Sequence, residues 1–321
     1  MIRTTAAAAG TIVPAMADEG YFPRGHSVLR RVHSERAVGL LYGQRALLIG
    51  SLHPLNFTGT LLSTRDPERP FARLVHTAHY FETVMFGTRA EADTILERVH
   101  ALHGQVHGEL PEAAGPWPAG TPYSATDPAL MLWTVAVSFD SAEALYEQLV
   151  RPLSHEEREA FWSDYVLFGE LFGIPEGYAP ATYADFRAYW RERLASDELH
   201  LTDTARRFAP RVTLELPLPP ERRPGLEALN LLLLGTVPAD IRRRFGIPWG
   251  PAREAAFRAG SLAVRHSRPL VPRRVRRGSN RASFDLVAAT ERRWIKQGRD
   301  HLRSPVARPS AASGERREVA S

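Results

Sequence analysis

The 321-residue sequence contains no cysteine, which excludes disulfide bonds, thiolate zinc sites, iron–sulfur clusters and a cysteine nucleophile. It also has no run of about 18 apolar residues, the length that a membrane-spanning helix needs. The N-terminus carries only Arg3 and no apolar core of a signal peptide, so we expect a cytoplasmic protein. The nucleophile-elbow, P-loop and dinucleotide-binding motifs are absent as well.

Lysine is almost absent: Lys296 is the single lysine among 41 basic residues, which we interpret as codon bias. Residues 265–321 hold 15 basic and 5 acidic residues, whereas residues 1–264 hold 26 basic and 31 acidic residues. A mildly acidic body does not suit a nucleic-acid-binding protein. The basic tail is interpreted first as a solvated segment and second as a segment that contacts an anionic membrane surface or nucleic acid. The arginines that stand out in this tail are Arg273, Arg274, Arg276, Arg277 and Arg281.

The periodicity of apolar residues predicts a chain that is almost entirely helical. Residues 71–86 repeat apolar positions at three- and four-residue spacing, as one face of a helix does. Thr88 and Glu91 form a capping box for a following helix that should extend to about His107 and end at Gly108. Asp127 before Pro128 predicts the start of a long helix that extends to about residue 149.

Further helices are expected towards the C-terminus. Ser154 and Thr182 are predicted N-caps of helices that extend to about residues 172 and 195. Weaker helices are expected at about 201–208, 221–234, 238–245 and 250–264, and residues 211–216 resemble a strand. Eight or more helices with almost no strand predict an all-α fold. We expect a loose arm at 1–24, one helical domain at 25–268 and a mostly disordered tail at 269–321, with a helix at 283–297.

Histidines offer most of the chemistry in this sequence. On a helical wheel His103 lies inside the apolar face of its helix, and His100 and His107 lie at the edge of that face. A histidine that points into a core is either a neutral structural residue or a metal or heme ligand. The three histidines do not form a metalloprotease site, because residues 104–106 are Gly-Gln-Val and supply no glutamate.

A polar stripe lies on the preceding helix. Arg73, Thr77 and Tyr80 lie within about 60° of one another at one edge of its apolar face. Arginine and threonine one turn apart can hydrogen-bond a bound oxygen species or a heme propionate. Alternatively, the arginine extends to solvent and the threonine hydrogen-bonds its own helix.

Over residues 30–265 the order and spacing of several motifs resemble the oxygenase family that includes MpaB and the bacterial latex-clearing (rubber) oxygenases. The similar segments are Ala46-Leu-Leu-Ile-Gly-Ser-Leu-His53-Pro54, Asp66-Pro67, Arg73-x-x-x-Thr77, Phe86-Gly87-Thr88, Val99-x-x-x-His103-x-x-Val106-x-Gly108, Tyr123-Ser-Ala-x-Asp127-Pro128-x-Leu130-x-Leu132-Trp133, Pro152-Leu-Ser and Gly173-Ile-Pro175.

The resemblance implies a helical, globin-like fold with one heme b and a reaction in which O₂ cleaves isoprenoid double bonds. It implies that His103 is the proximal ligand of the heme iron. We keep His107, at the edge of the same helical face, as the alternative ligand. Arg73 and Thr77 match an Arg/Thr pair near the heme, and His76 stands where rubber oxygenases have a lysine that can occupy the distal site.

The sequence departs from the rubber oxygenases at two places. No acidic residue corresponds to their distal carboxylate, and the nearest segment reads Asn56-Phe57. Thr134 and Val135 follow Trp133, where many members have a histidine.

We therefore expect a heme b-dependent oxygenase in which Arg73, Thr77 and His76 serve the reaction and His103, Arg73 and Thr77 hold the cofactor. Its expected partners are O₂ and a hydrophobic small-molecule substrate, with isoprenoids as the class that the family suggests. Two alternatives stay open. One is a non-heme metal enzyme built from histidines with Glu82 or Glu97. The other is a non-catalytic helical protein that binds a lipid or a partner in the same pocket.

Overall fold

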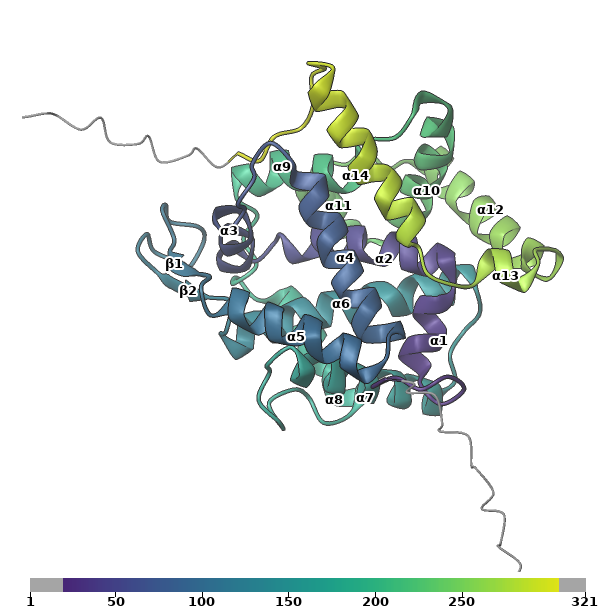
Figure 1. Ribbon diagram of the computed structural model, residues 1–321, viewed down its shortest axis with the longest axis horizontal. Helices are drawn as coiled ribbons and strands as arrows, with labels where there is room; N and C mark the ends of the chain where they lie inside the picture. Colours follow the sequence, from purple (N-terminus) through teal and green to yellow (C-terminus); the bar gives the residue numbers. More distant parts are fainter. Residues whose placement is uncertain (1–19, 306–321) are drawn as a thin grey trace, which may run out of the picture.

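The computed structural model describes residues 20–305 and consists of helices joined by short loops, with one two-stranded antiparallel ribbon (Figure 1). The helices and strands are α1 Val28–Ser34, α2 Arg36–Gly50, α3 Pro54–Leu62, α4 Pro70–Phe86, α5 Arg89–His103, β1 His107–Glu109, β2 Pro122–Ser124, α6 Pro128–Leu149, α7 His155–Leu171, α8 Tyr183–Ala195, α9 Asp203–Leu214, α10 Arg223–Thr236, α11 Ala239–Arg244, α12 Pro251–Ser267, α13 Arg273–Arg276 and α14 Arg281–Lys296. The prediction of an all-α fold is confirmed.

Helix α6 forms the centre of the molecule. It buries 16 of its 22 residues, and a helix that is buried on all sides lies inside a fold rather than on its surface. Its main neighbour is α2. Arg45 of α2 forms an ion pair of 2.8 Å with Asp140 of α6, and the indole of Trp133 donates to the carbonyl of Gly50 over 3.1 Å. The central pair of helices is thus held by polar bonds as well as by apolar packing.

The predicted helix starts are confirmed wherever a local capping residue marks them. Thr88 and Glu91 form the capping box of α5, and Ser154 opens α7 in the same way. The carboxylate of Asp127 accepts the first free N–H groups of α6, and Thr182 caps α8. These bonds join residues two or three positions apart, so the sequence alone contains the whole signal.

Two predicted elements are wrong. The helix expected to reach His107 ends at His103, because residues 107–109 pair as β1 with β2, with His107 opposite Ser124. The strand expected at 211–216 is the C-terminal part of α9, although Pro210 lies within that helix. Burial of Val212 and Thr213 on the inner face of α9 outweighs their preference for strands.

The ends of the described chain pack against the body. Residues 1–19 of the predicted arm lie outside the described residues, but Phe22 is 1% exposed and belongs to the core. The predicted helix at 283–297 is confirmed as α14, which packs along α4. The expectation of a mostly disordered tail therefore does not hold for 269–305, because α14 buries Val287, Ala288 and Glu291. Residues 306–321 lie outside the described residues.

The main apolar core includes residues from Phe22 to Leu302. A smaller apolar cluster includes Tyr123 of β2. Among residues 20–305 no helix combines the length and apolar character that crossing a bilayer requires.

Candidate functional site

The predicted site residues lie on α4 and α5, which are joined by the short turn at Gly87 and Thr88. The two helices diverge from this turn (Figure 1). Arg73, His76 and Thr77 lie in the N-terminal half of α4, and His103 is the last residue of α5. All four residues therefore lie towards the helix ends that are remote from the turn. Among the described residues, no hydrogen bond or ion pair joins His103 to the three residues of α4.

His103 is held at the end of α5 by local structure. Ala92, Leu96 and Val99 are buried on the same face of the helix, as the helical wheel predicts. The carbonyl of His103 accepts from the N–H of Val106, so the chain turns immediately after the histidine and enters β1.

The imidazole of His103 has the properties of an available ligand. Its Nδ1 is buried and has no hydrogen-bond partner, although the side chain as a whole is only half-buried. Loss of solvation and, second, the nearby His100 lower the pKa of His103 below its usual value of 6.5. The ring is therefore neutral at pH 7, and neutral imidazole is the form that binds iron.

Two other histidines also have a buried Nδ1 without a partner, but each is enclosed by the core. His33 is 2% exposed and its other nitrogen lies 2.8 Å from the hydroxyl of Tyr165. His53 is 3% exposed and its ring lies against Trp117 with 5.5 Å between ring centroids. Burial lowers the pKa of His33 to about 3 and that of His53 to about 4, so both rings are neutral structural groups. Only His103 of these three combines the unpartnered nitrogen with access from outside.

Arg73 connects α4 to the end of α3. Its guanidinium donates to the carbonyl of Thr60 and to the hydroxyls of Thr64 and Ser63. Burial lowers the pKa of Arg73, but an arginine remains charged at pH 7. Sequence reasoning missed the three hydroxyl residues of this connection. The signal that could have found them is the cluster of Ser and Thr at the C-terminal end of α3, where unpaired carbonyls attract a cation.

Thr77 and His76 lie on the exposed side of α4. The hydroxyl of Thr77 donates to the backbone carbonyl of Arg73 over 3.2 Å, so this side chain is bonded to its own helix. Tyr80, the third member of the predicted stripe, is half-buried and packs against the core. The three residues of the stripe thus differ: Arg73 hydrogen-bonds the end of α3, Tyr80 packs against the core, and Thr77 faces outward.

The other predicted ligands do not gather around His103. His107 is exposed on β1, and Nε2 of the exposed His100 lies 2.9 Å from the carbonyl of Leu171. Glu82 accepts from the N–H of Asn280 over 2.7 Å, so it is engaged in holding the start of α14. Among residues 20–305 no three His, Asp or Glu side chains form a group that could hold a metal ion. Heme supplies four nitrogen ligands of its own, so a heme site needs only one imidazole from the protein and no cluster of ligands.

The two positions at which the sequence departs from the rubber oxygenases lie together in the structure. The amide of Asn56 on α3 donates to the hydroxyl of Thr134 on α6 over 2.9 Å. Thr134 is exposed although it belongs to the most buried helix, so the surface reaches α6 at this point. Asn56 and Thr134 place a neutral, hydrogen-bonded pair on this part of the surface.

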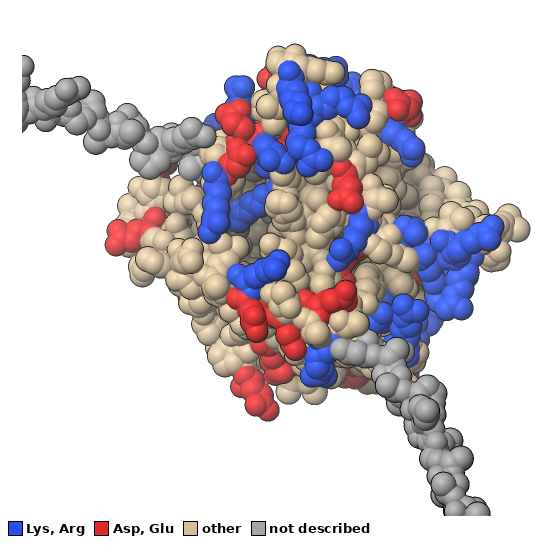
Figure 2. Space-filling model, viewed as in Figure 1, with Lys and Arg blue, Asp and Glu red and all other residues tan. Residues whose placement is uncertain are grey.

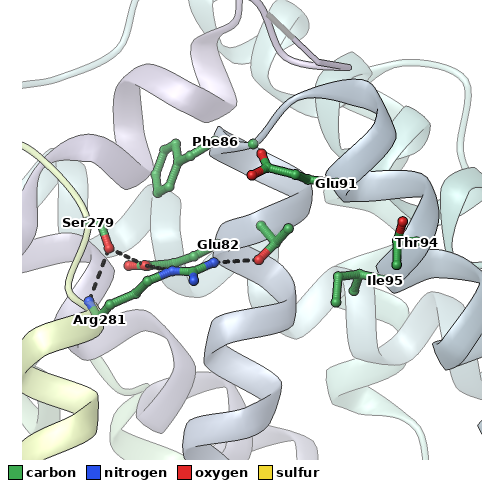
Figure 3. Close-up of a pocket in the computed structure, with 9 residues that line it drawn as sticks. Glu82, Phe86, Glu91, Thr94, Ile95, Ser279 and Arg281 are labelled. Carbon is green, nitrogen blue, oxygen red and sulfur yellow. Dashed lines mark hydrogen bonds and ion pairs between the residues drawn. The ribbon is translucent and has the colours of Figure 1, made fainter. Parts of the chain in front are cut away.

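A cavity of about 450 Å³ lies at the opposite end of the two helices, between α4, α5 and the start of α14 (Figure 3). Phe86 and Ile95 contribute apolar walls. The guanidinium of Arg281 donates a hydrogen bond to the hydroxyl of Thr83 and forms an ion pair of 3.8 Å with the carboxylate of Glu82. Ile95 precedes His103 by eight residues, which is about 12 Å along a helix. This cavity is therefore separate from the residues that the sequence singles out.

Comparison with known proteins supports the family resemblance that the motifs indicate. Residues 30–266 match the family model described as ER-bound oxygenase mpaB/B'/Rubber oxygenase, catalytic domain. No curated protein and no solved structure matches the chain. The match covers α2 to α12 and the strands, and therefore every predicted site residue.

Proposed function

We propose that this chain, which belongs to the family of mpaB and rubber oxygenase catalytic domains, is a heme b-dependent oxygenase. Membership of the family supports the use of O₂ by an oxidoreductase. Beyond this, we propose heme b as the cofactor, His103 as the ligand of its iron and a hydrophobic class of substrate. Its substrate would be a hydrophobic molecule with an isoprenoid double bond. Addition of both atoms of O₂ across a cleaved C=C bond gives two carbonyl ends, which balances the reaction without a further reductant.

His103 is the observation that carries the proposal. Its neutral ring, its buried unpartnered Nδ1 and its position at the accessible end of α5 fit a residue that holds an iron-containing group. A buried nitrogen without a partner costs about 1–3 kcal/mol, which a ligand or a repositioned ring would recover. Heme b, when bound, would supply the redox-active iron that O₂ chemistry requires.

The remaining residues act through position and polarity. Arg73 would fix α4 against α3, and its charge would favour the propionates of the cofactor. Thr77 and His76, which face outward on the same helix, would offer a hydroxyl and an imidazole to polar atoms of the bound molecules. Asn56 and Thr134 would line the approach to α6 with groups that neither give nor take a proton. The apolar helices would exclude water and accept the substrate.

The UV–visible spectrum of the purified protein, alone and with added hemin, tests this proposal. We expect a Soret band in the wild type and its loss or displacement in His103→Ala. His107→Ala is the matched control, because His107 is exposed on β1 and should leave the band unchanged. Isoprenoid-dependent O₂ uptake would then identify the substrate.

Other outcomes would point to the alternatives. Iron without porphyrin in a metal analysis would favour a non-heme enzyme. Binding of prenyl lipids without any Soret band would favour a non-catalytic binding protein. A Soret band that His107→Ala removes and His103→Ala leaves intact would refute the assigned ligand.

A further inference from the structure

A short projecting segment between α12 and α14 is held at both of its ends by one buried carboxylate. Glu35, which is 2% exposed, lies 2.7 Å from the guanidinium of Arg268 and 2.5 Å from that of Arg277. Arg276 lies 3.8 Å from the same oxygen. The backbone adds a second connection, because the N–H of Gly278 donates to the carbonyl of Ser34 over 2.8 Å. The segment is therefore a fixed feature of the surface.

Residues 269–275, between these attachment points, present apolar side chains to solvent. Leu270 is 84% exposed and Val275 is 56% exposed, whereas the core residues of the molecule are below 10%. Pro269 and Pro272 restrict the backbone, so the apolar side chains are presented without a large loss of conformational freedom on binding. We call residues 269–275 the tip.

The tip also carries free positive charge. Arg273 and Arg274 are exposed, and neither forms an ion pair with any residue in 20–305. Residues 255–284 contain eight arginines and no acidic residue. Figure 2 shows the resulting concentration of basic side chains over the α12–α13 corner, at the right of the view. The charges are thus divided: the inner arginines hold the segment to Glu35, and the outer two are available to a partner.

We propose that the tip docks the protein onto an anionic lipid bilayer. Exposed leucine and valine would enter the acyl boundary of the bilayer, and Arg273 and Arg274 would contact the lipid headgroups, as in proteins that bind at the membrane interface. The apolar side chains favour a bilayer over nucleic acid, because phosphate contacts need no apolar tip. This proposal stands on the surface alone and does not depend on the heme assignment.

Co-sedimentation of the full-length protein with vesicles tests the proposal. The vesicles are pure phosphatidylcholine or phosphatidylcholine with 30% phosphatidylglycerol. Two double variants, Arg273→Glu/Arg274→Glu and Leu270→Ser/Val275→Ser, separate the contribution of charge from that of apolar contact. Arg222→Glu/Arg223→Glu is the matched control, because it makes the same charge change at two exposed residues outside the tip. All the replaced side chains are exposed, so each variant should fold, and far-UV circular dichroism checks this.

We expect binding to the anionic vesicles, weaker binding to the neutral ones, and a loss of about tenfold in each tip variant. The control should retain at least half of the wild-type affinity. Equal binding by all variants would overturn the proposal. Loss of binding in the charge variant but not in the apolar variant, with equal binding to duplex DNA, would also overturn it and would indicate a general polyanion site.

Discussion

The contact between Glu291 of α14 and the start of α4 gives the sharpest prediction of stability. The carboxylate of Glu291 accepts from the backbone N–H of Phe71 over 3.0 Å and from that of Ala72 over 2.9 Å. The N-cap of α4 is Arg69, whose side chain makes no capping bond, so Glu291, which follows Phe71 by 220 positions, supplies the cap. Glu291 is 1% exposed, and water would not replace its oxygens if they were removed.

Replacing Glu291 with alanine leaves two buried N–H groups without acceptors. Each hydrogen bond to a charged group contributes about 1.5–3 kcal/mol, so the loss of both bonds in Glu291→Ala should lower the free energy of unfolding by about 3–6 kcal/mol. For a chain of this size 1 kcal/mol corresponds to about 2 °C, which predicts a fall in Tm of about 6–12 °C. Glu291→Gln, which keeps one carbonyl oxygen, should lose about half as much.

Thermal unfolding followed by circular dichroism at 222 nm measures this effect. Glu227→Ala is the matched control, because Glu227 is an exposed helical glutamate of α10. A Tm of Glu291→Ala within 2 °C of that of the control would refute the role of Glu291 as the cap of α4. Because α4 carries Arg73, Thr77 and His76, the variant should also weaken binding of any group held there, whereas Glu227→Ala should not.

Two further predictions concern α6 and α10. Burial raises the pKa of Glu143 to about 7, so this carboxyl stabilises the fold below pH 4.5 and loses that contribution as the pH rises towards 7. The free energy of unfolding of Glu143→Gln, measured in urea relative to that of the wild type, should rise by about 3 kcal/mol between pH 4 and pH 8. A difference between the two proteins that stays constant over this pH range would contradict the burial of an ionisable group. A Cβ at Gly235 would lie 2.1 Å from the ring of Phe257, whereas one at Gly225 would meet nothing within 4 Å. Gly235→Ala should therefore lower the free energy of unfolding by about 1–3 kcal/mol. Gly225→Ala in the same helix should be neutral or stabilising by up to ~1 kcal/mol. Equal Tm values for the two variants would contradict the close packing of Gly235 against Phe257.

The candidate site was only partly contained in the sequence. Periodicity alone placed His103 on the apolar face of α5, and the motifs placed Arg73, Thr77 and His76 on the preceding helix. Which of these side chains is free to contact a bound molecule was not predictable from the sequence. The bonds of Arg73 to α3, the exposure of Thr77 and the pairing of Asn56 with Thr134 all depend on how separate helices pack.

The sequence by itself determined where α5, α6, α7 and α8 begin, because in these helices the capping residue and the first turn lie within four residues. It also determined the all-α class, because apolar spacing is a property of each segment alone. Tertiary structure decided the rest. Pairing of His107 with Ser124 ended α5 early, burial kept residues 211–214 helical, and Glu291 drew a segment of the expected tail onto α4. Each of these outcomes depends on contacts between residues that are far apart in the sequence. Such contacts form only when the chain folds, so they contribute no signal to any one segment of the sequence.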